Sequence, residues 1–364
     1  MVPQDVPFRR LQSLQITDHR FATPGELVTW MGAVQAQDYA SAKWALGVRL
    51  PGLTDVDLEN AIAQKQIVRT WPMRGTLHFV PAKDAKWMLQ LMATKIIQAD
   101  ATRRKQLEIT DDQLAKAMQI MTAALKNNIC LKRADLLRAL DDNGVSTANQ
   151  RGYHLLAYAA WSGLICLGPM DGKQQTFVLL DEWVPGSIQL SHQDALTEIA
   201  VRFAQSHGPV TAHDLARWTK LSLAEVRLGL QSAGDRLKAV EINGAEYWTQ
   251  PHAPALTEAA HGTYLLPAFD EFVIGYKDRS AVLHADHEIK IVPGSNGVFL
   301  PMVVADGQVI GVWKRKLTKK VAIEVLLFKA PTAAQERAIT EAAQHFAAFV
   351  NLPLAPLVWT RLHY

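Results

Sequence analysis

The sequence lacks most of the features that would place it in an oxidising compartment or around a metal ion. Its 364 residues include only two cysteines, Cys130 and Cys166, and each stands between apolar neighbours. No Cys/His spacing of a zinc site is present. We therefore expect two buried free thiols of the kind found in a reducing cytosol, and no metal or other cofactor.

Long apolar runs are missing as well. No stretch of about 18 uncharged apolar residues occurs, which argues against a membrane span. The segment from Met1 to Asp5 shows no basic region followed by an apolar run, which argues against a secretory signal. The expectation is a cytoplasmic protein without a membrane partner.

An excess of one charge is also missing. Lys and Arg together number 38 and Asp and Glu 35, which gives a net charge of +3. This balance permits nucleic-acid binding where cations gather on one face, but does not require it. Hydrophobic residues make up 49% of the chain, so large packed cores are expected, and the length suggests several domains.

What is present begins with a clear pattern in the third quarter of the chain. Apolar residues recur at helical spacing from residue 195 to 205, Gly208-Pro209 interrupts the chain, and Thr211 and Ser222 can each cap a further helix. Strand-like segments at 238–242 and 245–249 flank Asn243-Gly244, a strong two-residue hairpin signal. Three helices followed by a hairpin predict a winged helix-turn-helix.

Two similar patterns precede it. One has helices at 114–125, at 133–140 and from Ser146 to about 162, then strands at 164–167 and 176–180 joined by a polar loop. The other begins with the capping-box order Thr23-Pro24-Gly25-Glu26, continues with a helix at 54–64, and has strands at 68–71 and 75–80 around Pro72-Met73. The last third differs, with strands expected at 263–266, 288–292, 297–304, 308–313 and 321–327 before a helix at 332–350.

The sequence therefore predicts an α+β protein, with tandem winged helix-turn-helix modules followed by a small C-terminal β-barrel-like domain and a terminal helix. The expected domains are residues 1–100, 101–188 and 189–255, each a winged helix, and residues 256–364, the β-rich domain.

Basic and polar residues fall where such modules usually meet DNA, on the third helix and the wing. Asn149-Gln150-Arg151 opens a third helix, where side chains and free backbone N–H groups can meet phosphate oxygens. For any one cluster, solvated surface charge explains the pattern equally well, but several clusters over several modules favour a DNA-binding face. The candidate DNA-binding residues are Arg69, Asn149, Gln150, Arg151, Lys277, Arg279, Lys314 and Arg315.

Several segments together resemble one family, the AlkZ/YcaQ-like bacterial DNA glycosylases. They span nearly the whole chain in the expected order, and Gln35 and Gln37 supply the Gln-x-Gln form of the motif. The segments are residues 32–38 (GAVQAQD), 71–78 (WPMRGTLH), 266–272 (LPAFDEF) with 275–279 (GYKDR), and 296–299 (NGVF) with 311–313 (GVW).

The resemblance implies a DNA-repair enzyme that removes N7-alkylated purines by base excision, including bulky adducts and interstrand crosslinks. Its partner would be double-stranded DNA carrying alkylated bases, bound by a monomer associated with the nucleoid. It implies that Gln35 and Gln37 are catalytic. Asp38, Arg74, Thr76 and His78 are further candidates to line the active site.

Two neutral amides are chemically sufficient for such a reaction. Breaking an N-glycosidic bond generates positive charge on the sugar, and an N7-alkylguanine is already cationic and leaves as a neutral base. A Gln carbonyl can accept a hydrogen bond from the attacking water and direct its dipole at C1′. In an extended segment Gln35 and Gln37 would share one face.

Other interpretations stay open. The two glutamines could belong to a polar loop that caps a neighbouring helix. The whole chain could be a transcription regulator without catalysis, or a scaffold whose winged helices bind proteins. Under the glycosylase hypothesis, an open cleft is expected rather than a tight base pocket. A hairpin at Pro293–Asn296 is expected to wedge into the DNA, and the reaction to leave the strand uncut because no imine-forming lysine stands out, Lys43 included.

Overall fold

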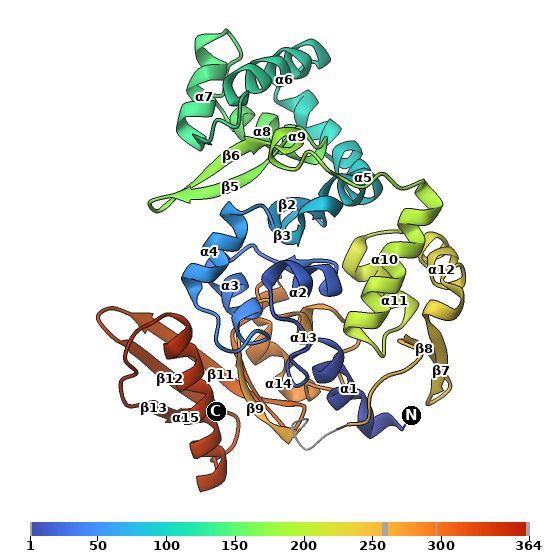
Figure 1. The fold of residues 1–364 in the computed structure, drawn as a ribbon, viewed down its shortest axis with the longest axis vertical. Helices are drawn as coiled ribbons and strands as arrows, with labels where there is room; N and C mark the ends of the chain where they lie inside the picture. The colour runs from blue at the N-terminus through green and yellow to red at the C-terminus, as the bar shows by residue number, and fades with distance from the viewer. Residues whose placement is uncertain (1, 257–260, 296, 362–364) are drawn as a thin grey trace. The chain divides into compact units, whose positions relative to one another are not determined.

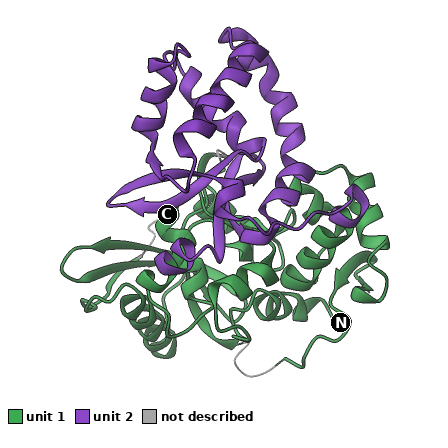
Figure 2. Ribbon diagram, turned by 45° about the horizontal axis from the view of Figure 1, so that its top comes forward, with its two compact units in different colours: residues 1–58, 196–364 green, residues 59–195 purple. Residues whose placement is uncertain are grey.

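The computed structural model describes residues 2–256, 261–295 and 297–361 (Figure 1). The chain forms two compact units, one of residues 1–58 with 196–364 and one of residues 59–195 (Figure 2). The chain passes between them within helix α4 (Asp55–Ala63) and near the start of helix α10 (His192–His207). The fold is α+β, as expected from the sequence.

The unit of residues 59–195 combines a twisted sheet with a helical cluster. Its strands lie in the order β3-β2-β5-β6-β4, and β2 pairs with β5 through Arg69 and Leu167. Apolar residues of α6, α7, α8 and the β5–β6 hairpin form one buried core, with Met121, Leu136 and Leu155 at its centre. The elements are β2 (Ile67–Met73), β3 (Thr76–Pro81), η2 (Ala82–Asp84), α5 (Ala85–Gln106), α6 (Asp111–Leu125), β4 (Leu131–Lys132), α7 (Arg133–Asp142), α8 (Arg151–Trp161), β5 (Ile165–Asp171), β6 (Gln174–Leu179) and α9 (Leu180–Trp183).

The other unit contains both termini and an open sheet. A five-stranded sheet has the order β13-β12-β11-β10-β9, with β13 parallel to β12 and the other neighbours antiparallel. The elements are η1 (Pro3–Asp5), α1 (Val6–Ser13), α2 (Pro24–Met31), β1 (Val34–Gln35), α3 (Tyr39–Gly47), α11 (Ala212–Thr219), α12 (Leu223–Gln231), η3 (Gly234–Arg236), β7 (Lys238–Ile242), β8 (Ala245–Thr249), β9 (Thr263–Leu266), α13 (Glu271–Ile274), α14 (Ala285–Ile291), η5 (Pro293–Ser295), β10 (Met302–Ala305), β11 (Gln308–Leu317), β12 (Val321–Leu327), α15 (Ala333–Phe349) and β13 (Val358–Arg361).

Local capping explains why several helices start where they do. Thr23, Thr211, Ser222 and Thr332 each accept a hydrogen bond from the backbone N–H three residues later, and the acidic or amide residue there bonds back. This reciprocal arrangement satisfies donors that a helix start leaves unpaired. The predicted helix starts at these residues are confirmed.

The β7–β8 hairpin occupies the predicted residues. Asn243 and Gly244 form its turn with φ values of 52° and 74°, a left-handed backbone that Asn and Gly tolerate best. Val210 adds a bridge to Trp248 of β8. The α10, α11, α12, β7, β8 order is therefore the order that the sequence predicted.

Elsewhere several predicted boundaries are wrong. Helix α8 begins at Arg151, not near Ser146, because Asn149 and Gln150 adopt positive φ angles of 52° and 71°. Strand β2 continues through Pro72-Met73 with an irregularity, and the turn is Arg74-Gly75. The hairpin formed by β5 and β6 extends to Asp171 and Gln174 where a polar loop was expected. The 22-residue helix α5 was not predicted.

The C-terminal region departs further from expectation. Residues expected to form a strand at 288–292 lie mostly in α14, where the His284 side chain caps Asp286 N–H and acidic residues occupy the first turn. The segment Pro293–Ser295 is a 3-10 turn and not a hairpin, and Asn296 is outside the described residues. The sheet order from β13 to β9 is open, so no closed barrel forms among the described strands.

An aromatic cluster fixes helix α3 against the C-terminal sheet and α15. Trp44 lies edge-on to Phe346 at 5.1 Å between ring centroids and donates from Nε1 to the carbonyl of Leu265 at 2.7 Å. Trp313 contacts the same Phe346 ring at 5.3 Å. A Cβ atom at Gly47 would lie 2.6 Å from the Phe349 ring, so only glycine permits this approach. The segment that precedes α3 is thereby held on a rigid base.

The two thiols differ from expectation. Cys166 is buried as predicted, and burial raises its pKa, but Cys130 is exposed. The prediction was wrong for Cys130 because it lies on the coil between α6 and β4, where apolar neighbours do not ensure burial. Among the described residues, no helix has the length and apolarity needed to cross a membrane.

Candidate active site

The Gln-x-Gln segment is a short connection between two helices. Helix α2 ends at Gly32, whose φ of 74° reverses the chain, and Val34–Gln35 forms the short strand β1. The chain then bends at Gln37-Asp38, and the Asp38 carboxylate caps α3 by accepting from Ser41 N–H at 2.9 Å. Both ends of the segment are thus fixed by local backbone structure.

The two glutamines occupy different environments. The Gln35 side chain is buried, with 7% of the residue exposed, and its Oε1 has no hydrogen-bond donor among the described residues. Gln37 is exposed. A buried amide oxygen without a donor is costly, so the Gln35 side chain marks a place where a polar ligand or water is expected.

A buried carboxylate, that of Glu271, holds the backbone of the Gln-x-Gln segment by a hydrogen bond. Glu271, 1% exposed, accepts the Gln35 backbone N–H on Oε1 at 3.0 Å and the Trp218 indole N–H on Oε2 at 3.0 Å. His207 Nε2 lies 3.4 Å from the same Oε2. Sequence reasoning did not select these residues, although Glu271 lies in one of the segments that carry the family resemblance.

A charged group lies on the α3 side of the motif. Arg315 of β11 donates to Ser41 Oγ at 3.3 Å and lies over the Trp313 and Phe346 rings at 5.6 and 5.2 Å. Burial lowers the pKa of this guanidinium, while the carboxylates of Asp38 and Asp55 oppose the shift. Arg315 therefore sits beside the motif, where sequence reasoning had assigned it only to a basic surface cluster.

Lys43 is the amine nearest to the motif in sequence. Its Nζ pairs with Asp55 Oδ2 at 2.7 Å, and its side chain is 9% exposed. A buried, ion-paired ammonium is poorly suited to attack C1′, because a nucleophilic lysine must lose its proton.

The remaining predicted lining residues belong to the β2–β3 hairpin of the other unit. His78 Nδ1–H donates to the carbonyl of Thr76 at 2.9 Å, which leaves Nε2 to accept from Arg74 Nη2 at 3.0 Å. Arg74 holds a φ of 56° at the turn, an uncommon backbone conformation for a residue with a long side chain. Thr76 Oγ1 is buried without a partner among the described residues.

The predicted DNA-binding residues differ in availability. Arg151 donates to Ser146 O, Glu108 O and Gln113 Oε1 and also contacts Leu107 O, so its guanidinium is committed within the chain. Asn149 and Gln150 are exposed, and Gln150 Oε1 accepts from Arg103.

The other predicted DNA-binding residues also include both exposed side chains and side chains that are bonded within the chain. Arg69 is buried and donates to Gln175 Oε1 at 2.9 Å, and Arg279 pairs with Glu288 at 2.7 Å. Lys277 and Lys314 are exposed, and Lys314 Nζ lies 3.9 Å from Glu324 Oε2. The exposed members are thus the better candidates for phosphate contacts.

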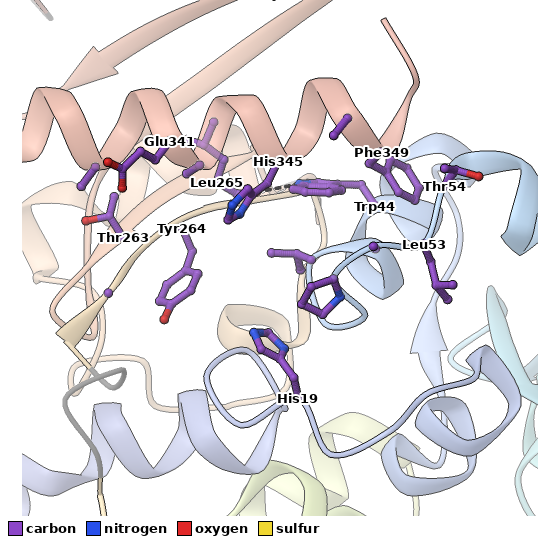
Figure 3. A pocket seen from close by; sticks show the side chains of 18 of the residues that line it. His19, Trp44, Leu53, Thr54, Thr263, Tyr264, Leu265, Glu341, His345 and Phe349 are labelled. Carbon is purple, nitrogen blue, oxygen red and sulfur yellow. Dashed lines mark hydrogen bonds between the residues drawn. The ribbon is translucent and has the colours of Figure 1, made fainter.

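A cavity of about 520 Å³ lies in the unit of residues 1–58 and 196–364, between α3, β9 and α15 (Figure 3). Its walls include Trp44, Tyr264, His345 and Phe349, and neither motif glutamine lines it. Burial raises the pKa of Tyr264 to about 12, so its hydroxyl stays neutral. Among the described residues, no group of three or more His, Cys, Asp or Glu side chains is placed to hold a metal ion.

Comparison with known proteins shows the family of this chain. The model of the DNA glycosylase AlkZ-like family matches residues 28–349. The chain is 26% identical over 321 residues to the interstrand DNA cross-link repair glycosylase of Streptomyces sahachiroi, covering 84% of this chain and 85% of that protein. The solved structure of the Streptomyces sahachiroi DNA glycosylase AlkZ shares the fold, with a TM-score of 0.82 at 23% identity over 99% of this chain and 100% of that one. The chain therefore belongs to the AlkZ-like family and is a DNA glycosylase.

Proposed function

We propose that the protein hydrolyses the N-glycosidic bond of N7-alkylated purines in double-stranded DNA, with Gln35 and Gln37 as the catalytic residues. The observation that carries this proposal is the pair of amides on one braced segment, Gln37 exposed and Gln35 with an Oε1 that lacks a donor. The name of the Streptomyces relative supports extending the proposed substrates to interstrand crosslinks, and we propose bulky adducts as further substrates.

The proposed reaction requires the protein mainly to orient the attacking water and the amide dipoles toward C1′. The cationic base needs no proton to leave, so no general acid is required at the leaving group. The Gln37 carbonyl accepts a hydrogen bond from the attacking water, whose proton passes to solvent as the C1′–O bond forms, and the Gln35 dipole stabilises the charge that develops at C1′. The Asp38 carboxylate caps α3, which favours the two glutamines over Asp38 as the catalytic groups.

The reaction is proposed to end at an abasic site with the strand intact. A lyase forms an imine through an unprotonated lysine, and Lys43 is held in its ion pair with Asp55. Borohydride treatment of the enzyme with its substrate is therefore expected to trap no covalent adduct.

The DNA-binding surface is proposed to consist of the tandem winged helices and the C-terminal domain. Residues 1–100, 101–188 and 189–255 would each form one winged helix, with Asn149 and Gln150 near phosphates at the start of α8. Exposed Lys277 and Lys314 would add contacts from residues 256–364, and the protein would act as a monomer. The element order of residues 111–179 and 192–249 supports this division.

The direct test is release of N7-methylguanine from duplex DNA under single-turnover conditions with saturating enzyme. Gln35→Ala and Gln37→Ala are each expected to lower the rate constant by about 100-fold, the usual loss when one stabilising group is removed. Binding of the lesion duplex should persist, because the phosphate contacts are unaffected.

Gln344→Ala serves as the matched control, since Gln344 is an exposed amide on α15 of the same unit. Its rate constant should equal that of the wild type. Wild-type rates in both motif variants would remove the catalytic assignment. Sequence-specific binding to intact DNA with no base release would instead identify a regulator.

A further inference from the structure

The segment at residues 266–279 resembles the family, yet the proposed chemistry makes no use of it. Its Glu271 is buried with 1% exposed, at the first position of the short helix α13. An uncompensated carboxylate at this depth is strongly unfavourable, so its partners indicate what it is for. Those partners lead directly to the catalytic segment.

Glu271 divides its two oxygens between two fixed donors. Oε1 accepts the backbone N–H of Gln35 at 3.0 Å, and Oε2 accepts the indole N–H of Trp218 at 3.0 Å. The bond to Gln35 links positions that are 236 residues apart in the sequence. It holds the backbone of β1 at the residue that carries one of the two amides.

Residues of α10 pack around the Glu271 carboxylate. The Ser206 hydroxyl donates to the carbonyl of Arg202 at 2.6 Å, so its oxygen accepts from His207 Nδ1–H at 2.8 Å. The His207 ring stacks on Phe203 at 4.5 Å and presents Nε2 to Glu271 Oε2 at 3.4 Å. Trp218 of α11 therefore binds the carboxylate directly, while His207 of α10 lies against it with Nε2 at 3.4 Å from Oε2.

We infer that Glu271 is a positioning residue for base excision, which acts through the backbone of Gln35 to set both amides of the Gln-x-Gln segment. This inference rests on the proposed function of the two glutamines. Glu271 is too buried to meet a substrate, and both of its oxygens are engaged. Its effect arises because displacement of a reacting group by about 1 Å can cost about 100-fold in rate.

The geometry requires a carboxylate rather than an amide. Both Gln35 N–H and Trp218 Nε1–H are donors, and each needs an oxygen. The Glu271→Gln side chain has the same shape but only one oxygen, so its NH₂ group must face one of the two donors. Packing is kept while the hold on Gln35 is weakened, which makes this substitution a sharp test.

The experiment measures single-turnover release of N7-methylguanine at saturating enzyme, together with lesion-duplex affinity and thermal melting. Glu271→Gln is expected to lower the rate constant at least 10-fold, with affinity within about twofold of the wild type. Glu198→Gln removes an acid on α10 that pairs with Arg202 and Arg236, and it serves as the control with an unchanged rate.

A second substitution that restores the excision rate would distinguish a positioning role of Glu271 from general damage to the fold. Trp218→Phe removes the competing donor, so the amide of Glu271→Gln can turn its NH₂ toward His207 Nε2 and its oxygen toward Gln35 N–H. The double variant Glu271→Gln/Trp218→Phe should therefore recover to within about threefold of Trp218→Phe alone. Glu271→Gln should cause no further loss in a Gln35→Ala/Gln37→Ala background, because both amides that Glu271 positions are then absent.

The outcomes distinguish this inference from the proposed function. If the wild type releases no base, the proposed function fails. If the wild type is active and Glu271→Gln matches it, or if Trp218→Phe gives no recovery, the positioning role is contradicted. Should Glu271→Gln not fold alone, the double variant is compared with Trp218→Phe: similar rates support the inference, and a tenfold lower rate overturns it.

Discussion

Single buried side chains near the motif hold it in place through fully desolvated bonds. Arg49 pairs with Asp270 through two bonds of 2.9 and 2.8 Å, with side-chain exposures of 1% and 0%. The guanidinium also donates to the carbonyls of Leu14 and Ala45, each at 2.7 Å. Because every polar atom of this ion pair has a partner, the pair fixes the chain immediately before Glu271.

Removing one partner of this pair should be severe. Arg49→Ala leaves Asp270 buried without its cation and is expected to cost about 3–5 kcal/mol of unfolding free energy, measured by urea denaturation. Arg20→Ala is the control, because Arg20 pairs with Asp18 at 30% and 32% side-chain exposure and should cost less than about 1 kcal/mol. Equal losses from the two variants would contradict the argument.

At the scale of single residues, the sequence predicted the Gln-x-Gln motif but not the buried side chains that hold it in place. Gln35 and Gln37 were found through the Gln-x-Gln segment. Glu271, His207 and Trp218 approach that segment only through tertiary packing, and a single sequence carries no local signal of such contacts. Arg315 was assigned by charge alone, and charge does not show that a guanidinium lies over Trp313 and beside Ser41.

Elements with their own start and stop signals were predicted best. The capped helices α2, α11 and α12 and the Asn-Gly hairpin β7–β8 are set by residues within a few positions of one another. The strand expected at 288–292 was wrong because Glu288 to Val292 alternates like a strand, whereas the cap at His284 starts a helix. Long helix α5 gave no clean amphipathic pattern, since its second half is largely polar and exposed.

The β11–β12 hairpin presents cations that no acid of the described chain neutralises closely. Lys316, Lys319 and Lys320 are exposed around its turn. Replacing all three with Ala is expected to weaken binding to duplex DNA and to lower the slope of log affinity against log salt by about 2–3. Titration by fluorescence anisotropy at several salt concentrations measures this slope.

The control for that measurement is the variant with Lys316→Arg, Lys319→Arg and Lys320→Arg, which keeps three cations on the hairpin and should keep the wild-type slope. A triple alanine variant with the wild-type slope would show that this hairpin does not meet phosphates. The excision rate constant at saturating enzyme should be retained in the triple variant, because none of the three lysines belongs to the Gln-x-Gln segment.

At the scale of the whole molecule, composition and pattern predicted an α+β chain with its β-rich part at the C-terminus. They did not predict that the C-terminal sheet stays open, because closure depends on strand count and tilt and not on local alternation. Helix α3, which follows the Gln-x-Gln segment, meets β11 and α15 through Trp44, Trp313 and Phe346, so residues from both ends of the chain pack together. Such long-range packing follows from the fold as a whole.

Under the proposed function, uncharged amides suffice because the damaged base is already cationic. The most direct measurement compares single-turnover release of N7-methylguanine and of uracil, a neutral base, from otherwise identical duplexes. Uracil must leave either protonated or as an anion, and neutral Gln35 and Gln37 supply neither an acid nor a positive charge, so its release should be at least about 100-fold slower. Release of both bases at similar rates would contradict the account.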